Sequence, residues 1–372
     1  MIWSLAWFGA YAVGGGMAWH FFVQGQQAIT DLDNPVTGGV HLYAGLPQLQ
    51  IGPLPLVTAW LFSRFGPRPS LLLAQVFSAA AGVLILWLVE RLAQQTRPDL
   101  TAEQIRWRIR LAGFFFAPVW LYLAVASVHL DDVLTLLFGV LASVAAQRRK
   151  AALTGLLLGL AVDSKPWAVP FAIIVLMLPG ARARAGALAT LIATVGACWL
   201  PFLVLDPHTL NAIRFTIANT PRTALRVLGI NSPRTPPWDR PAQTLLGLLL
   251  GAIAWHRGRW AAVILLTVAA RIVLDPGTNL YYSAGAVVGA ALWDIAGSSH
   301  RFPWWTMLTS ISLFDARHVG FAPSVNGWLT LGVFAACTAF LVVSRIEPRG
   351  IPQKSVQEIL RRSSRDCVHD NN

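Results

Sequence analysis

The sequence predicts an all-α fold, a polytopic transmembrane helical bundle of about 12 spans with both termini in the cytoplasm. Three observations support this. Of the 372 residues, 55% are hydrophobic and 12% are charged, whereas soluble domains carry about 25% charged residues. The mean hydropathy is +0.55. The apolar residues also come in blocks of about 16–24, the length that a helix needs to cross a bilayer. Each block must pair its own backbone groups in lipid, so we expect helices.

The predicted spans follow one another from the first block to a basic tail. Residues 151–180 are interrupted by Asp163-Ser164-Lys165-Pro166, so we expect two short spans that meet at a polar break. Residues 51–65 hold two prolines and about 13 apolar positions, which fits an interfacial helix better than a span. The spans are expected at 3–22, 70–92, 111–128, 132–146, two within 151–180, 187–205, 242–255, 260–274, 280–296, 303–314 and 326–344.

The basic residues predict how this bundle is oriented. With a cytoplasmic N-terminus, the cationic clusters that follow the spans fall on the inner side, as the positive-inside rule requires. The outer side then receives the acidic turns and the two longest connections, 23–69 and 206–240. Residues 1–345 are predicted to form one transmembrane domain, and 346–372 a disordered, basic cytoplasmic tail.

The net charge of +12 bears on the partners of the chain. In a soluble protein it would indicate nucleic acid. In a bilayer protein the cations set the topology and face anionic headgroups, so we expect membrane lipids and no nucleic acid. Only three of the 29 cationic residues are lysines. This bias, with abundant Ala and Gly, is typical of a GC-rich bacterial genome.

Polar residues at the outer edge are candidate site residues, because ionisable groups are costly at the membrane. Asp31 and Asp33 lie in the polar loop that directly follows the first span. Either suits a general base near the bilayer surface, or both cap a short helix. In the turn after the third span, His129, Asp131 and Asp132 could bind a metal or a sugar hydroxyl, or an Asp could simply cap the next span. This turn permits a divalent ion without requiring one, and we assign no metal ligand or cofactor.

Anion binding is suggested by cations on the outer side. Lys165 lies at the polar break, where it either snorkels to the interface or binds phosphate at a broken-helix junction, with Asp163 as its partner in the absence of an anion. Arginine forks match phosphate oxygens, and the connection 206–240 carries five: Arg214, Arg222, Arg226, Arg234 and Arg240. A further outer turn gathers Arg271, Asp275, Asn279, Tyr281 and Tyr282, although its tyrosines are also typical of an interface belt.

The order of these motifs resembles a known family. An acidic outer loop is followed by Tyr43 and Gly52-Pro53-Leu54-Pro55, then by His129-Leu130-Asp131-Asp132, then by the stretch from Gly155 to Pro166. The order is similar to that of the GT-C superfamily of polyprenyl-phosphate-sugar-dependent glycosyltransferases, most closely the bacterial mannosyltransferase-like branch of glycosyltransferase family 87. The likeness covers roughly residues 1–180.

The resemblance implies an inverting transfer of a sugar, mannose before others, from a polyprenyl-phosphate donor to a cell-envelope glycolipid or glycan on the outer face of the plasma membrane. Asp33, or Asp31, would deprotonate the acceptor hydroxyl, and Lys165 would meet the donor phosphate. Further phosphate contacts are expected from Arg222 and Arg226, and substrate contacts from His41, Tyr43, Gln50, His129, Asp131, Asp132, Asp275 and Tyr281.

Two other functions fit the same spans and buried charges. A transporter or lipid flippase should show paired repeats and a midplane site. A non-catalytic subunit of an envelope-assembly complex would tolerate the loss of Asp31, Asp33 and Lys165. The polar residues gather at the outer edge rather than at the midplane, which favours the enzyme.

Overall fold

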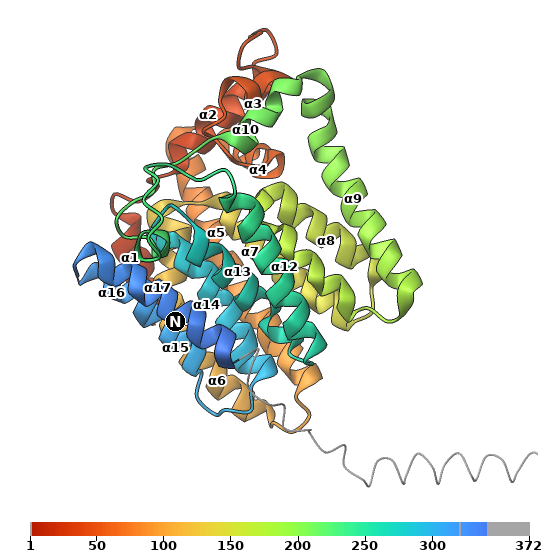
Figure 1. Cartoon of the computed structure of the whole chain (residues 1–372), viewed down its shortest axis with the longest axis vertical. Coiled ribbons are helices and arrows are strands. Elements are labelled where there is room, and N and C mark those ends of the chain that lie inside the picture. The colour runs from red at the N-terminus through yellow and green to blue at the C-terminus, as the bar shows by residue number, and fades with distance from the viewer. Residues whose placement is uncertain (1, 320, 341–372) are drawn as a thin grey trace, which may run out of the picture. The chain divides into compact units, whose positions relative to one another are not determined.

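The computed structural model describes residues 2–319 and 321–340, and all its regular elements in these ranges are helices (Figure 1). Four are long and apolar enough to cross a membrane. They are α5 (Pro67–Thr96), α6 (Ala102–Leu121) with its continuation η2 (Tyr122–Ser127), α7 (Leu130–Gln147) and α9 (Gly180–Leu205). They coincide with the spans predicted at 70–92, 111–128, 132–146 and 187–205. The helical membrane character is therefore confirmed.

The other predicted spans correspond to shorter helices. The polar break at Lys165 is confirmed, because α8 (Ala151–Ser164) ends there and the 3₁₀ helix η3 (Pro166–Met177) begins. The helices after residue 220 are α11 (Ala224–Val227), α12 (Asp239–His256), η5 (Trp260–Ala262), α13 (Val263–Leu274), η6 (Leu280–Tyr282), α14 (Ser283–Leu292), η7 (Trp293–Gly297), α15 (Trp304–Ser310), η8 (Ile311–Asp315), α16 (Ala316–His318) and α17 (Pro323–Thr338). The count of 12 spans and the cytoplasmic termini stay predictions, and the predicted tail 346–372 lies outside the described residues.

The first predicted span, 3–22, is not one helix. Helix α1 (Ile2–Ala12) ends before a run of glycines, and α2 (Trp19–Thr30) begins after it. Gly14 and Gly16 adopt φ of 70° and 88°, a left-handed conformation that glycine accepts without steric cost. The backbone N–H groups of residues 16–18 donate to the carbonyls of residues 125–127. The break is therefore paired with the end of η2, as non-helical backbone within a membrane protein requires.

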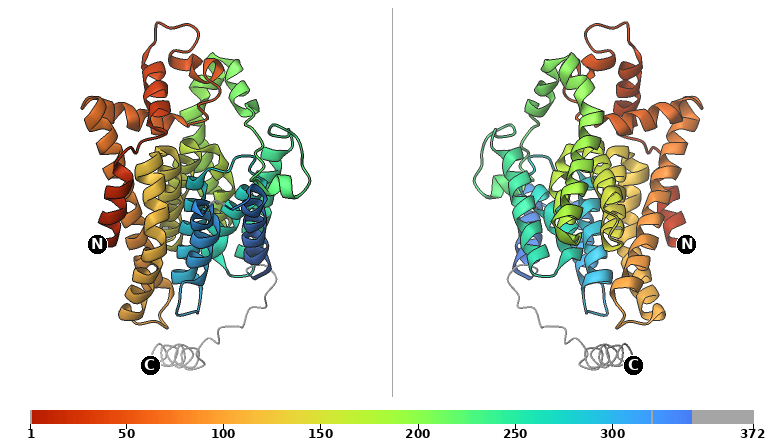
Figure 2. Two further views of the ribbon diagram at one scale, coloured as in Figure 1. Left: turned by 90° about the vertical axis from the view of Figure 1, so that its left-hand side faces the viewer. Right: turned by 90° about the vertical axis from the view of Figure 1, so that its right-hand side faces the viewer.

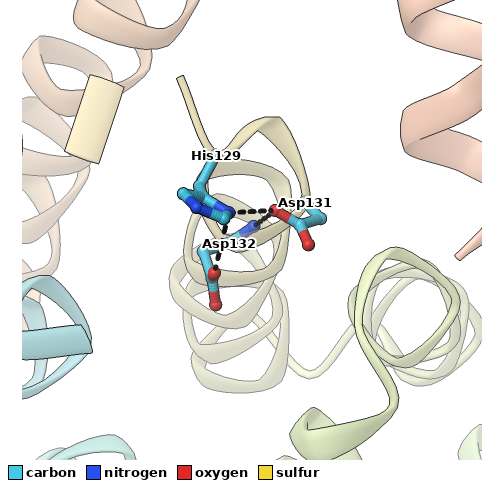
Figure 3. Close-up of side chains that lie close together, drawn as sticks. All are labelled: His129, Asp131 and Asp132. Carbon is cyan, nitrogen blue, oxygen red and sulfur yellow. Dashed lines mark hydrogen bonds and ion pairs between the residues drawn. The ribbon is translucent and has the colours of Figure 1, made fainter. Parts of the chain in front are cut away.

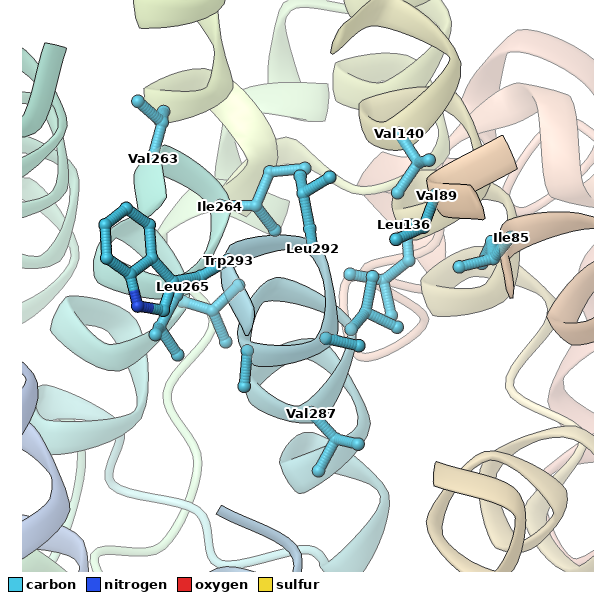
Figure 4. Close-up of a cluster of buried hydrophobic side chains, with 14 of the residues drawn as sticks. Ile85, Val89, Leu136, Val140, Val263, Ile264, Leu265, Val287, Leu292 and Trp293 are labelled. Atoms are coloured by element: carbon cyan, nitrogen blue, oxygen red, sulfur yellow. The ribbon is translucent and has the colours of Figure 1, made fainter. Parts of the chain in front are cut away.

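Helix α7 lies at the centre of the bundle, and α9 lies at its edge. The buried share of the apolar window is 83% for α7 and 6% for α9. The main core joins α5, α7, α13 and α14, and Figure 4 shows buried side chains from each of these helices, among them Leu136 and Ile264. In a bilayer these side chains leave lipid rather than water, so van der Waals packing between the helices stabilises this core.

A smaller layer covers one end of the bundle (Figures 1 and 2). It comprises α2, η1 (Gly39–His41), α3 (Leu42–Gly45), α4 (Pro53–Ser63), η4 (Pro207–Leu210) and α10 (Asn211–Arg214). We call it the outer layer. It has its own apolar core, in which Tyr43 packs on Trp199 and Phe202 near the end of α9. Helix α4 has 11 residues, about 17 Å at 1.5 Å per residue, so it is too short to cross, as predicted.

Candidate functional site

The turn between η2 and α7 holds three of the candidate side chains (Figure 3). Val128 has a left-handed φ of 54°, a strained conformation for a β-branched residue and one that often marks functional sites. The hydrogen bonds from residues 16–18 to η2 hold this turn from one side. Asp131 and Asp132 occupy the first turn of α7, where the helix dipole favours negative charge.

Lys165 reaches this turn from the break between α8 and η3. Its Nζ lies 2.5 Å from Asp131 Oδ2 and 2.9 Å from Asp132 Oδ2. The prediction that Asp163 is the partner of Lys165 is wrong. Asp163 Oδ2 instead accepts a hydrogen bond of 3.1 Å from the backbone N–H of Leu54, at the start of α4. The Lys165 ammonium is thus neutralised by the two acids at the start of α7.

Arg271, at the end of α13, completes the charge arrangement. Its guanidinium lies between the rings of Trp167 and Tyr282, at 4.4 and 4.5 Å from their centroids. Arg271 Nη1 lies 3.7 Å from Asp132 Oδ1, and Nε lies 3.6 Å from Asp275 Oδ2. We call Asp131, Asp132, Lys165, Arg271 and Asp275 the ion-pair cluster.

Aromatic side chains line the ion-pair cluster. The indole Nε1 of Trp167 donates to Asp132 Oδ1 at 3.1 Å. The rings of His129 and Tyr281 stack, with centroids 3.6 Å apart and planes 23° apart. Flat, partly polar walls of this kind suit recognition of a ligand that has both apolar and polar faces.

Buried acids and arginines extend the cluster toward the connection 206–240. Burial raises the pKa of Asp275. Burial, together with the charge of Asp275, raises the pKa of Asp239 to about 7. Arg317 donates to the carbonyl of Asn279 at 3.2 Å, and burial with the nearby charge of Arg222 lowers its pKa to about 10. Asp239 and Arg317 have no motif around them, and the sequence assigned them no role.

The predicted phosphate ligands Arg222 and Arg226 differ in what they contact. Arg222 is exposed. The guanidinium of Arg226 donates to the carbonyls of Asn219, at 3.1 Å, and Asn231, at 2.9 Å. The guanidinium of Arg226 therefore stabilises its own loop. Arg222 is the more available of the two arginines for binding an anion.

The predicted residues of the first outer segment have different surroundings in the structure. Asp31 and Asp33 are exposed, and neither side chain has a hydrogen bond or ion pair within residues 2–319 and 321–340. His41 Nδ1 lies 2.7 Å from Asp206 Oδ2. Tyr43 is buried and donates to the carbonyl of Ile51 at 2.8 Å. The Gln50 amide oxygen, suitably oriented, lies 2.7 Å from Arg240 Nη2.

A metal ion does not fit the ion-pair cluster as it stands. Ligand atoms of His129, Asp131 and Asp132 lie within 4.8 Å of one another, a spacing typical of metal sites. However, the Lys165 ammonium already contacts both carboxylates. A divalent ion between these oxygens would lie against a positive charge, which is strongly unfavourable in a buried site.

Comparisons with protein-family models, curated proteins and solved structures find no significant match. The fold and the site define the class of protein only broadly: a helical protein with four helices long and apolar enough to span a membrane, and a charged cluster where the ends of α7, α8 and α13 meet.

Proposed function

We propose that this chain is a membrane glycosyltransferase that moves a sugar, mannose before others, from a polyprenyl-phosphate donor to a cell-envelope glycolipid or glycan at the outer face of a bacterial plasma membrane. The observation that supports it best is the ion-pair cluster, in which Lys165, 15% exposed, and Arg271, 9% exposed, lie beside three carboxylates. Ionisable groups among apolar helices are costly and generally serve a function.

The reaction needs one base and one cationic region. The acceptor hydroxyl attacks the anomeric carbon, its proton passes to a carboxylate, and the bond between that carbon and the phosphate oxygen breaks with inversion. Asp33, or Asp31, is the proposed base. Both side chains are exposed, so closing of the outer layer over the bound acceptor is part of this proposal.

The leaving phosphate gains a negative charge that positive side chains stabilise. Lys165 is proposed for this role, with Arg222 on the side of the connection 206–240. In the free protein the ammonium of Lys165 is shared between Asp131 and Asp132. A donor phosphate would compete with these carboxylates, and the stacked His129 and Tyr281 would face the sugar.

Transfer by the purified, detergent-solubilised protein tests the proposal. Synthetic polyprenyl-phosphate mannose is the donor, and a membrane lipid extract supplies acceptors. We expect the wild type to transfer sugar. The transfer rate should fall at least about 100-fold in Asp33→Asn or Asp31→Asn, and also in Lys165→Ala. Lys150→Ala, at the other end of α8, should transfer sugar at the wild-type rate. No transfer from this donor or its glucose and arabinose analogues would favour a transporter or an assembly subunit.

A further inference from the structure

We infer that the ammonium group of Lys165 takes the place of a divalent metal ion between Asp131 and Asp132, so that the chain excludes metal, and that removal of Lys165 alone creates a metal site. This inference concerns the electrostatics of the ion-pair cluster. It holds whether or not the chain transfers sugars, so its failure and the failure of the proposed function are separate outcomes.

The ligand geometry of a metal site is present around the ammonium. Lys165 Nζ lies 2.5 Å from Asp131 Oδ2 and 2.9 Å from Asp132 Oδ2, so it bridges two carboxylates as a cation would. The third donor is His129, whose Nδ1 lies 3.4 Å from Asp131 Oδ1 and 4.0 Å from Asp132 Oδ2. Two carboxylate oxygens and an imidazole nitrogen are a common ligand set for Mn²⁺ and Zn²⁺.

His129 supplies an independent observation. Its Nδ1 is buried and makes no well-formed hydrogen bond in the part of the chain that the structure describes; its nearest contact is Asp131 Oδ1, at 3.4 Å. A buried polar atom without a partner calls for a specific explanation. The ring cannot easily turn away, because it stacks on Tyr281. The nitrogen therefore faces the two carboxylates and is available as a metal ligand.

The charges explain why the wild type excludes a metal. Asp131 and Asp132 carry two negative charges. The Lys165 ammonium contacts both carboxylates, whereas the Arg271 guanidinium is shared between Asp132 and Asp275. Arg271 is held between two aromatic rings. Of these two cations, Lys165 is therefore the one that a metal ion could replace. The Asp131 side chain is 1% exposed, and without Lys165 it would be a buried carboxylate in need of a counter-ion.

Binding of Mn²⁺ to the full-length protein in detergent, followed by the loss of its free-ion electron paramagnetic resonance signal, tests the inference. Lys165→Ala should bind one Mn²⁺ at least about 100-fold more tightly than the wild type, because a buried positive charge a few ångströms from the ion is removed. Asp131→Asn added to this variant should abolish the gain. Lys150→Ala, at the opposite end of α8, should behave as the wild type does.

Two further measurements keep the inference testable if Lys165→Ala does not fold. Lys165→Met keeps the apolar stem of the side chain and should also bind Mn²⁺. In the wild type, neither Mn²⁺ nor a chelator should change the temperature of unfolding, since a ligand stabilises only the state that binds it. Tight Mn²⁺ binding by the wild type, or none by either folded Lys165 variant, would overturn the inference.

Discussion

At the scale of single residues, the ion pair between Asp131 and Lys165 has large energetic consequences because the side chain of Asp131 is 1% exposed and that of Lys165 is 15% exposed. Loss of one partner leaves the other charge in a medium that solvates it poorly. Asp131→Asn should therefore destabilise the protein by about 3 kcal/mol, the low end for a broken buried pair because Asp132 still contacts Lys165. The measurement is thermal or denaturant unfolding in detergent, followed by circular dichroism.

Asp33→Asn is the matched control for this substitution, because it removes the same charge from an exposed position. Substitutions away from buried networks usually change stability by less than about 0.5 kcal/mol. Equal destabilisation by both variants would mean that the Asp131 ion pair contributes nothing beyond general charge balance.

The contact between His41 and Asp206 predicts a pH dependence of the outer layer. The hydrogen bond from His41 holds the pKa of Asp206 below its ordinary value of 3.8. A carboxyl with a lowered folded-state pKa stabilises the fold above the ordinary value, and this contribution is lost as pH falls through the lowered one. Protection of η1 and α3 against hydrogen exchange, relative to amides of α7, should decrease as pH falls below 3.8 toward the lowered pKa.

His41→Gln removes the charge-assisted partner and is the variant that checks the cause. Its protection of η1 and α3 should be weaker at neutral pH and should vary less across the same acidic range. An unchanged pH profile in this variant would assign the acid sensitivity to another group.

At the scale of elements, the outer layer is attached to the bundle by close backbone contact. The N–H of Gly52 donates to the carbonyl of Ser164 at 3.2 Å, and a Cβ at Gly52 would overlap the carbonyl of Asp163. Gly52→Ala should therefore displace α4 from the end of α8 and disturb the neighbouring Lys165. We expect a loss of about 2–3 kcal/mol, typical of overpacking, and reduced sugar transfer.

Gly186→Ala in α9 is the control, since a Cβ there meets no atom within 4 Å. Alanine has the higher helix propensity, so this variant should be neutral or stabilised by up to about 1 kcal/mol. Unfolding temperature and transfer rate, measured for both variants together, separate a local clash from a general sensitivity to added side chains.

Single elements were predictable from the sequence to different degrees. The long spans follow from hydropathy alone, and the polar break at Lys165 follows from Asp163, Lys165 and Pro166. The break at Gly14–Gly16 was missed because apolar residues flank it on both sides, although three consecutive glycines are a recognised signal. The partner of Asp163 was missed because it is a backbone N–H of a segment more than 100 residues away.

At the scale of the whole molecule, the charge pattern predicts which polar turns share one side of the membrane, but it does not predict which turns touch. The charge pattern assigned 129–131, 163–166 and 275–279 to the same side, and the structure brings side chains of these turns into the ion-pair cluster. The closeness of Asp132 to Lys165 and Arg271 depends on how α7, α8 and α13 pack. That packing depends on the shapes of side chains such as Leu136 and Ile264, which periodicity does not encode.

The last prediction concerns the orientation of the chain in the membrane, because the proposed chemistry needs the ion-pair cluster on the outer side. In a variant whose three native cysteines are replaced, single cysteines at Leu32 and Leu228 should react with a membrane-impermeant maleimide in intact cells. Cysteines at Arg148 and His256 should react only after the cells are lysed. All four positions are exposed, so a difference in labelling reports sidedness rather than burial.

The reverse labelling pattern would put the ion-pair cluster in the cytoplasm. A donor there would compete with soluble nucleotide sugars, and the case for a polyprenyl-phosphate sugar would fail even if the fold and the cluster stand. Labelling of Leu32 and Arg148 from the same side would mean that an odd number of the proposed crossings between them is wrong, since α5, α6 and α7 are each long enough to cross. The expected pattern requires all three helices to cross in alternate directions, which is the arrangement that the arginine clusters after α5 and α7 favour.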